Sequence, residues 1–128
     1  MKSAFNYAEC STAERLKVGC VIVKDDRIIS IGYNGMPSGW TNICEDRDFK
    51  TKPEVLHAEE NAITKLARSN ESGEGATAFI THVPCLSCAK LLYSSGIIEV
   101  WYTHPYKNTE GLDFLNDCNI KVNAYADN

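Results

Sequence analysis

Two short stretches of the chain hold side chains that suit metal chemistry. The first runs from His57 to Glu59 and reads H-A-E, and the second runs from Pro84 to Cys88 and reads P-C-L-S-C. Cys85 and Cys88 are three residues apart, so on one helical turn their sulfur atoms share a face. Two thiolates and one imidazole give zinc three ligands and leave the fourth tetrahedral position to water, as in catalytic sites. The pattern predicts a catalytic Zn²⁺ held by His57, Cys85 and Cys88.

Glu59 is predicted to carry protons rather than to bind the metal. In mid-helix it would point about 200° away from His57, but where a helix begins both side chains can address one centre. Two thiolates cancel the formal charge of the ion, which then acidifies water less than an all-histidine site would. A nearby carboxylate is therefore needed to accept the proton of the water. Each part also has a simpler interpretation, since C-x-x-C occurs in redox pairs and a lone histidine is more often only hydrogen-bonded.

The elements that must position these residues follow from the apolar pattern along the chain. The pattern predicts helices over residues 2–15, 54–68, 86–95 and 112–117. It predicts strands over residues 18–23, 28–31, 76–81, 97–103 and 120–125. An opening hairpin followed by strand–helix–strand crossovers indicates an α/β fold, a three-layer α-β-α sandwich with a mixed five-stranded sheet. With 128 residues, the chain is expected to form one domain, residues 1–128.

Composition and charge exclude several classes of partner. The net charge is −4 and the 13 basic residues form no cluster, which argues against a nucleic-acid partner. No apolar run approaches the ~18 residues that a membrane span requires, and residues 1–10 lack the apolar segment of a secretory signal. We therefore expect a cytoplasmic protein, or one of the host cytoplasm if the chain is viral. Cysteines stay reduced there, so four of them are expected to be idle or core thiols: Cys10, Cys20, Cys44 and Cys118.

Taken together, these motifs resemble the zinc-dependent cytidine deaminase superfamily. The H-A-E and P-C-x-x-C motifs are common to the superfamily. The segment from Gly32 to Gly39, G-Y-N-G-M-P-S-G, is similar to the deoxycytidylate (dCMP) deaminases of phages and eukaryotes. The resemblance covers almost the whole chain. It implies hydrolysis of dCMP to dUMP and ammonia, which supplies dUMP for thymidylate synthesis.

The resemblance also implies a role for each site residue. Water activated by zinc attacks C4 of the pyrimidine, and Glu59 takes its proton, protonates N3 and later delivers a proton to the departing ammonia. The backbone N–H of Ala58 meets the base carbonyl, and Asn34 meets the sugar 3′-hydroxyl. Tyr106 stacks on the base. Arg15 is the candidate for the 5′-phosphate.

Regulation and assembly are further implications of the resemblance. dCTP is expected to activate and dTTP to inhibit, and Mg²⁺ is a candidate companion of the nucleotide triphosphate. The nucleotide is expected to contact Gly32, Tyr33, Asn34 and Gly35 between the subunits of a homo-oligomer, commonly a hexamer. Some members hold a second, structural zinc with histidines that precede the H-A-E motif. Residues 41–56 contain no histidine, so we expect one zinc per chain.

Alternatives remain at three positions and for the function. Asn34 precedes Gly35 and would suit a turn without any ligand, Tyr106 could simply pack, and Arg15 could be a solvated charge. The substrate could instead be tRNA adenosine, free cytidine or guanine, although the acidic composition argues against tRNA. A non-catalytic zinc module is the alternative outside enzymes. A structural site would normally close its fourth position with a protein ligand and has no use for Glu59.

Overall fold

The structure is a computed structural model that describes residues 1–126. Residues 127–128, which the domain prediction includes, lie outside the described residues. The four helices of the described part are α1 (Lys2–Ala8), α2 (Ala58–Ala67), α3 (Leu86–Ser94) and α4 (Glu110–Asp117). Its strands are β1 (Gly19–Lys24), β2 (Arg27–Tyr33), β3 (Thr77–His82), β4 (Glu99–His104) and β5 (Lys121–Ala124).

The strands form the predicted mixed sheet, in the order β2-β1-β3-β4-β5. β1 pairs antiparallel with both β2 and β3, whereas β4 pairs parallel with β3 and with β5. Parallel neighbours require a crossover, and α3 and α4 supply the two crossovers. β1 is buried along most of its length because it lies inside the sheet with helices on both faces.

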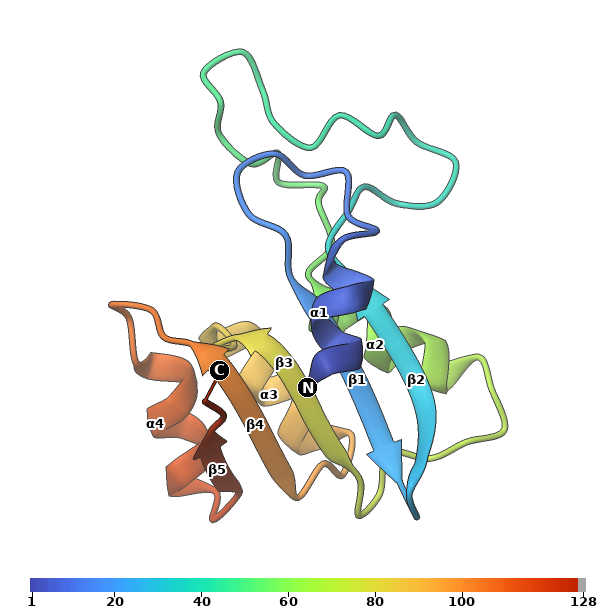
Figure 1. Cartoon of the computed structure of the whole chain (residues 1–128), viewed down its shortest axis with the longest axis vertical. Coiled ribbons are helices and arrows are strands. Elements are labelled where there is room, and N and C mark those ends of the chain that lie inside the picture. The colour runs from blue at the N-terminus through green and yellow to red at the C-terminus, as the bar shows by residue number, and fades with distance from the viewer. Residues whose placement is uncertain (127–128) are drawn as a thin grey trace.

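Helices cover both faces of the sheet, which confirms the three-layer sandwich. Gly19 of β1 lies against the backbone of Ala4 and Ala8 in α1, and Gly32 of β2 lies against the backbone of Ala58 and Ala62 in α2. Gly32 pairs with Cys20, the neighbour of Gly19, and successive strand residues point to opposite faces. Figure 1 accordingly shows α1 in front of the sheet and α2 and α3 behind it.

The main core lies between the sheet and the helices α2, α3 and α4. Small alanines on α2 and α3 bring these helices close to the strands, and larger side chains such as Ile22, Ile80 and Leu92 are fully buried there. Burying a side chain of this size contributes about 1.5–3 kcal/mol. This packing fixes where α2 and α3 begin relative to the sheet.

The first predicted helix is too long. α1 ends at Ala8, not at residue 15, because polar side chains after it bond to distant loops. Ser11 donates its hydroxyl hydrogen to the Asn34 carbonyl at 2.7 Å, and Thr12 donates to the Asn42 carbonyl at 2.8 Å. Serine and threonine often make such bonds in place of helical ones.

The second predicted helix begins too early. α2 starts at Ala58, not at residue 54, because Leu56 exchanges two backbone hydrogen bonds with Gly35, at 2.8 and 3.1 Å. The backbone N–H of His57 donates to the Glu60 carboxylate at 2.8 Å, half of a capping box that starts the helix. The ends of the other elements agree with the predictions to within two residues.

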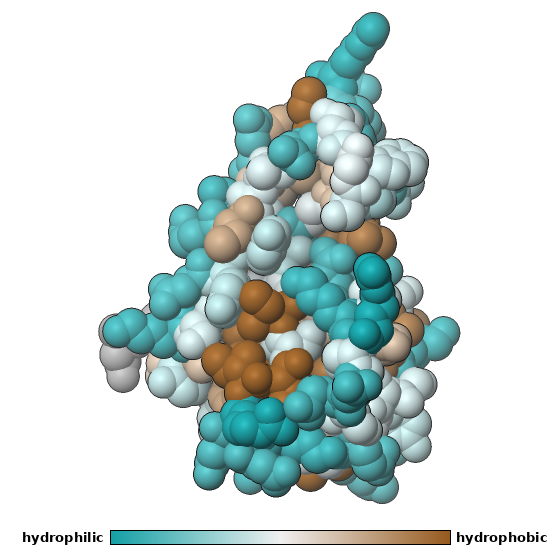
Figure 2. Space-filling view, turned by 90° about the vertical axis from the view of Figure 1, so that its right-hand side faces the viewer, coloured by the Kyte–Doolittle hydropathy of each residue, from teal (hydrophilic) through white to brown (hydrophobic). Residues whose placement is uncertain are grey.

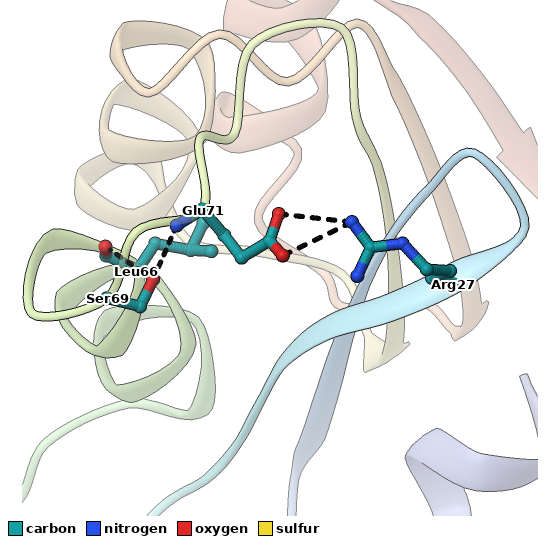
Figure 3. Close-up of polar contacts among 4 residues, drawn as sticks. All are labelled: Arg27, Leu66, Ser69 and Glu71. Carbon is teal, nitrogen blue, oxygen red and sulfur yellow. Dashed lines mark hydrogen bonds and ion pairs between the residues drawn. The ribbon is translucent and has the colours of Figure 1, made fainter.

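Polar contacts at the surface hold the segment that follows α2. Arg27 of β2 and Glu71 after α2 form an ion pair at 3.2 Å, and the Glu71 backbone N–H donates to the Ser69 hydroxyl (Figure 3).

β2 is an edge strand and leaves one edge of the sheet open. Hydrophobic side chains gather at the surface on this side of the molecule (Figure 2), where Ile28 is 51% exposed. Within residues 1–126, no helix has the length and apolar character to span a bilayer.

The close approach of β2 and α2 predicts a large effect of Gly32→Ala. An added methyl group would overlap the Ala58 carbonyl and lie 2.6 Å from the Ala62 nitrogen. We expect the free energy of unfolding, measured by urea denaturation, to fall by about 2–3 kcal/mol. Gly35→Ala is the control, because nothing lies within 4 Å of a methyl group there, and it should be neutral or slightly stabilising. Equal stability of the two variants would contradict this packing.

Candidate metal centre and pocket

Two helix starts meet at one end of the sheet and carry the predicted metal ligands. His57 is the residue before α2 and Cys85 the residue before α3, and both have extended backbones. β3 ends at His82, so the chain needs only Val83 and Pro84 to reach Cys85. Gly111, in the first turn of α4, packs against the Pro84 carbonyl with no room for a side chain. The start of α3 is therefore held by both β3 and α4.

The distances between the three ligand atoms fit zinc. His57 Nδ1 lies 3.2 Å from Cys88 Sγ and 3.6 Å from Cys85 Sγ, and all three atoms lie within 4.8 Å of one another. Zinc bonds of about 2.0 Å to nitrogen and 2.3 Å to sulfur place tetrahedral ligands about 3.5 Å apart. In residues 1–126, no other group of three such ligands is found. The donor set therefore suits a zinc ion with one open coordination position.

Without metal, the three ligands share protons in a way that favours one thiolate. Hydrogen bonds from Cys88 and His57 lower the pKa of Cys85 to about 3. The pKa of Cys88 is raised, first because its thiol donates to Cys85 and also because it is buried. The hydrogen bond with Cys85 raises the pKa of His57 to about 9. Binding of zinc requires deprotonated ligands, so it must release the protons of Cys88 and His57.

Glu59 is buried next to this cluster, with only 4% of its surface exposed. Burial disfavours the carboxylate and raises the pKa of Glu59 to about 7. A group with such a pKa can both accept and return a proton near neutral pH, as general acid–base catalysis requires. The structure thus brings the four residues of the two motifs together.

A pocket of about 240 Å³ opens beside the metal ligands. Four of its lining residues belong to the two motifs: His57, Ala58, Glu59 and Cys85. The remaining lining residues are Ala13, Leu16, Val18, Asn34, Thr51, Val55, His82, Val83 and Tyr106. The walls are mostly apolar with a few polar groups, which is typical of small-molecule sites.

Asn34 lines the pocket and also holds one of its walls. Its side-chain oxygen accepts from the backbone N–H of Val18 at 2.9 Å, and its amide nitrogen donates to the Leu16 carbonyl at 2.8 Å. The side-chain amide has two hydrogens and two lone pairs, so one of each remains for a ligand. Asn34 therefore has a structural function, because it holds the backbone of Leu16 and Val18 in place. It also lines the pocket.

Tyr106 reaches the pocket from the segment after β4, although it is 44% exposed. Burial of part of the ring raises the pKa of its hydroxyl, and the charges of Glu59 and Cys85 add to this effect. That electrostatic influence indicates that Tyr106 lies close to the metal ligands. Tyr106 thus lines the pocket, and its stacking on a base stays a prediction.

The remaining predicted residues lie elsewhere. Arg15 is exposed and is not among the pocket-lining residues of the described chain, although its neighbour Leu16 is. Gly32 packs on α2, Gly35 pairs with Leu56, and the Tyr33 carbonyl accepts from the Asn61 amide at 2.8 Å. The phosphate role of Arg15 and the regulatory role of the 32–35 segment stay predictions.

Sequence reasoning missed most of the apolar residues that line the pocket, and it also missed the polar Thr51. Thr51 and Val55 reach the pocket from the irregular segment 34–57, which extends beyond the end of the sheet (Figure 1). A smaller core of Ala13, Cys44 and Val55, with Met36 against it, holds this segment to the start of the chain. No periodicity in the sequence indicates such contacts. All six cysteines are free, and Cys20 and Cys44 are buried as expected.

The sequence is similar to known proteins over most of its length. Residues 1–104 match the family described as the cytidine and deoxycytidylate deaminase zinc-binding region. The chain is 35% identical to the deoxycytidylate deaminase of Saccharomyces cerevisiae, over 98% of this chain and 43% of that enzyme. It is also 35% identical to the deoxycytidylate deaminase of Enterobacteria phage T4, over 83% of this chain and 77% of the phage enzyme. The chain thus spans less than half the length of the yeast relative.

A solved structure matches along nearly the whole chain. The dCMP deaminase of cyanophage S-TIM5, in complex with dCMP and dUMP, superposes with a TM-score of 0.95 and 42% identity. The match covers 97% of this chain and 92% of the cyanophage chain. The fold is therefore the cytidine deaminase-like fold.

The ligand distances predict one zinc ion per chain. We expect metal analysis of the purified protein to find it, and Cys88→Ser to lower the zinc affinity at least about 100-fold, because loss of an outer partner alone costs about 10–100-fold. A chelator competition assay measures this affinity. Cys10→Ser, at an exposed cysteine, should bind zinc normally. Two zinc ions per chain, or full affinity in Cys88→Ser, would contradict the assignment.

Proposed function

We propose that this chain, which belongs to the cytidine and deoxycytidylate deaminase zinc-binding family, hydrolyses dCMP to dUMP and ammonia. One observation carries the proposal: three zinc-ligand atoms lie within 4.8 Å of one another, and two of their residues, His57 and Cys85, line a pocket together with the buried Glu59. The similar cyanophage structure is a complex with dCMP and dUMP, which supports dCMP over the other amino-bearing bases. The dUMP formed would be available for thymidylate synthesis.

His57, Cys85 and Cys88 would hold the zinc ion. When bound, zinc is a Lewis acid that lowers the pKa of a coordinated water molecule. Within residues 1–126 the cluster contains three ligands and no fourth one, so one position would be open to that water. A purely structural site would close this position, and it would not need a buried carboxylate.

Glu59 moves the protons of the reaction. One carboxylate oxygen takes a proton from the attacking water and passes it to N3 of the cytosine. The water oxygen forms a bond to C4, and the bond from C4 to the amino nitrogen breaks when that nitrogen has received a second proton through Glu59. Water and dCMP are thereby converted to dUMP and ammonia, and Glu59 returns to its initial state.

The pocket walls would orient the base and the sugar. The backbone N–H of Ala58 lies in the first turn of α2, where a helix offers no internal acceptor, so it is available to the base carbonyl. The remaining amide hydrogen and lone pair of Asn34 are available to the sugar 3′-hydroxyl. Tyr106 would stack on the base from the exposed side. Arg15 would contact the 5′-phosphate, since Leu16 next to it borders the pocket.

Regulation by nucleotides belongs to the same proposal. The segment that includes Gly32, Tyr33 and Gly35 would bind dCTP or dTTP, with Mg²⁺ as companion of the triphosphate. It is continuous with Asn34, which holds the pocket wall formed by Leu16 and Val18. A nucleotide that shifts this segment would therefore change the shape of the pocket.

Assembly and location complete the proposal. The open edge strand β2 and the hydrophobic side chains near it (Figure 2) support a homo-oligomer, which we propose to be a hexamer. The free cysteines suit the reducing cytoplasm. The acidic net charge, −4, does not favour a nucleic-acid partner.

Ammonia release from dCMP and from deoxycytidine tests the function directly. With zinc-loaded protein we expect turnover of dCMP and a much lower kcat/KM for deoxycytidine, since the two differ only in the phosphate. Glu59→Gln should lower kcat about 10²–10⁴-fold, the usual contribution of a general acid–base group, while zinc content is retained. Arg15→Ala should raise KM for dCMP alone.

The matched control is Glu71→Gln, which makes the same change at the surface ion pair with Arg27. It should leave both kinetic constants unchanged. Turnover of neither substrate by the zinc-loaded protein would refute the proposed function. Full activity of Glu59→Gln would refute the role of this carboxylate.

The regulatory proposal predicts that dCTP and dTTP act in opposite directions. At subsaturating dCMP, added dCTP should raise the rate and dTTP should lower it, because each nucleotide would stabilise a different state of the 32–35 segment. Rate curves against dCMP with each nucleotide and Mg²⁺ measure the effect. Curves that are identical with and without both nucleotides would rule out regulation by this route.

A further inference from the structure

His82 is a pocket residue that neither the metal centre nor the proposed mechanism uses. It ends β3 and lines the pocket together with Tyr106. Its ring stacks on that of Tyr106, with centroids 6.0 Å apart and an angle of 28°. Its ring also packs against that of His104, with centroids 4.8 Å apart, and His104 in turn packs edge-to-face with Phe5 of α1 at 5.6 Å. A row of rings thus extends from α1 to the pocket and holds His82 in place.

A buried hydroxyl determines which nitrogen of His82 carries the hydrogen. Thr81 is fully buried, and its Oγ1 accepts from the backbone N–H of Gly19 at 3.1 Å. The same oxygen lies 2.8 Å from His82 Nδ1. A threonine hydroxyl has one hydrogen to donate, and leaving it unpaired in the interior would cost about 1–3 kcal/mol. All groups are satisfied when Thr81 donates to His82 Nδ1.

His82 is then a neutral ring whose hydrogen sits on Nε2. Burial, together with the nearby His104, lowers the pKa of His82 to about 4, which agrees with a neutral ring. Among residues 1–126, no hydrogen-bond partner of Nε2 is found, and this atom is not one of the buried unpaired ones. The ring borders the pocket, so a bound molecule can provide the acceptor that Nε2–H lacks.

We propose that His82 is a substrate-binding residue whose Nε2–H donates to an acceptor oxygen of the bound nucleotide. The same ring supports Tyr106 from the side away from the base. The hydrogen bonds from the Gly19 backbone N–H to Thr81 and from Thr81 to His82 fix the donor before substrate binds. Little ordering of the side chain is then needed on binding. This inference rests on the proposed function, because it names a further contact in the same pocket.

Two substitutions test the N–H donor and the aromatic ring of His82 separately. His82→Phe keeps a ring against Tyr106 but has no N–H, whereas His82→Gln keeps an N–H at a distance similar to that of Nε2 but has no ring. Loss of one hydrogen bond predicts that His82→Phe raises KM for dCMP about 5- to 10-fold with little change in kcat. His82→Gln should bind dCMP more tightly than His82→Phe. The dissociation constant for unreacted dCMP, measured by calorimetry with Glu59→Gln in each background, should follow the same order.

A second substrate locates the acceptor. If His82→Phe weakens only dCMP, the acceptor is a phosphate oxygen, and if it weakens dCMP and deoxycytidine equally, the acceptor belongs to the nucleoside. Either result supports the proposal. Wild-type binding of both substrates by His82→Phe would overturn it, as would tighter binding by His82→Phe than by His82→Gln.

The hydrogen on Nε2 can be observed without any turnover. Long-range ¹H–¹⁵N spectra of protein with labelled histidines distinguish the two neutral forms, and His82→Gln identifies the signal among the three histidines. We expect the Nε2–H form in the wild type and in Thr81→Ser, which keeps the hydroxyl, and a shift away from it in Thr81→Val. A signal from Nδ1–H in the wild type would overturn the proposal. If dCMP is not a substrate but the Nε2–H form is seen, the proposed function is refuted, whereas the assignment of His82 Nε2–H as a donor fixed by Thr81 is supported.

Discussion

The site depends on one constraint: the starts of α2 and α3 must lie within bonding distance of a single ion. His57 and Cys85 are the residues just before these helices, so a shift of either helix would separate Nδ1 from the sulfur atoms. Close backbone contacts restrict such a shift. Gly32 fixes α2 on the sheet, and Gly111 fixes the turn before α3. The core between the sheet and the helices therefore stabilises the fold and also keeps the metal ligands within bonding distance of one ion.

The same helix starts explain the electrostatics of the site. The free N–H groups at the beginning of a helix favour negative charge, which suits the thiolates of Cys85 and Cys88. Glu59 lies in the first turn of α2 and is buried, so its carboxylate is disfavoured and its pKa rises to about 7. One helix thus provides a ligand, a proton carrier and, at Ala58, a backbone donor. His82 adds a neutral donor from the end of β3.

Much of this arrangement could be predicted from the sequence, because it is local. β1 has a continuous apolar run, and Cys85 and Cys88 share a helical face by spacing alone. The predictions that failed concern residues whose neighbours are distant in sequence. Ser11 bonds to the Asn34 carbonyl and so limits α1, and Leu56 pairs with Gly35 and so delays α2. Thr51 and Val55 come to the pocket through a long irregular segment, whose course no periodic pattern encodes.

X-ray absorption at the zinc edge reports the ligand set of the bound ion and therefore tests whether His57, Cys85 and Cys88 hold it. We expect two sulfur neighbours at about 2.3 Å, from Cys85 and Cys88, and two nitrogen or oxygen neighbours at about 2.0 Å, from His57 and one water molecule. The water contribution should change when a nucleotide analogue fills the pocket. Three or more sulfur neighbours would contradict this ligand set, and a first shell that is the same with and without the analogue would contradict an open position facing the pocket.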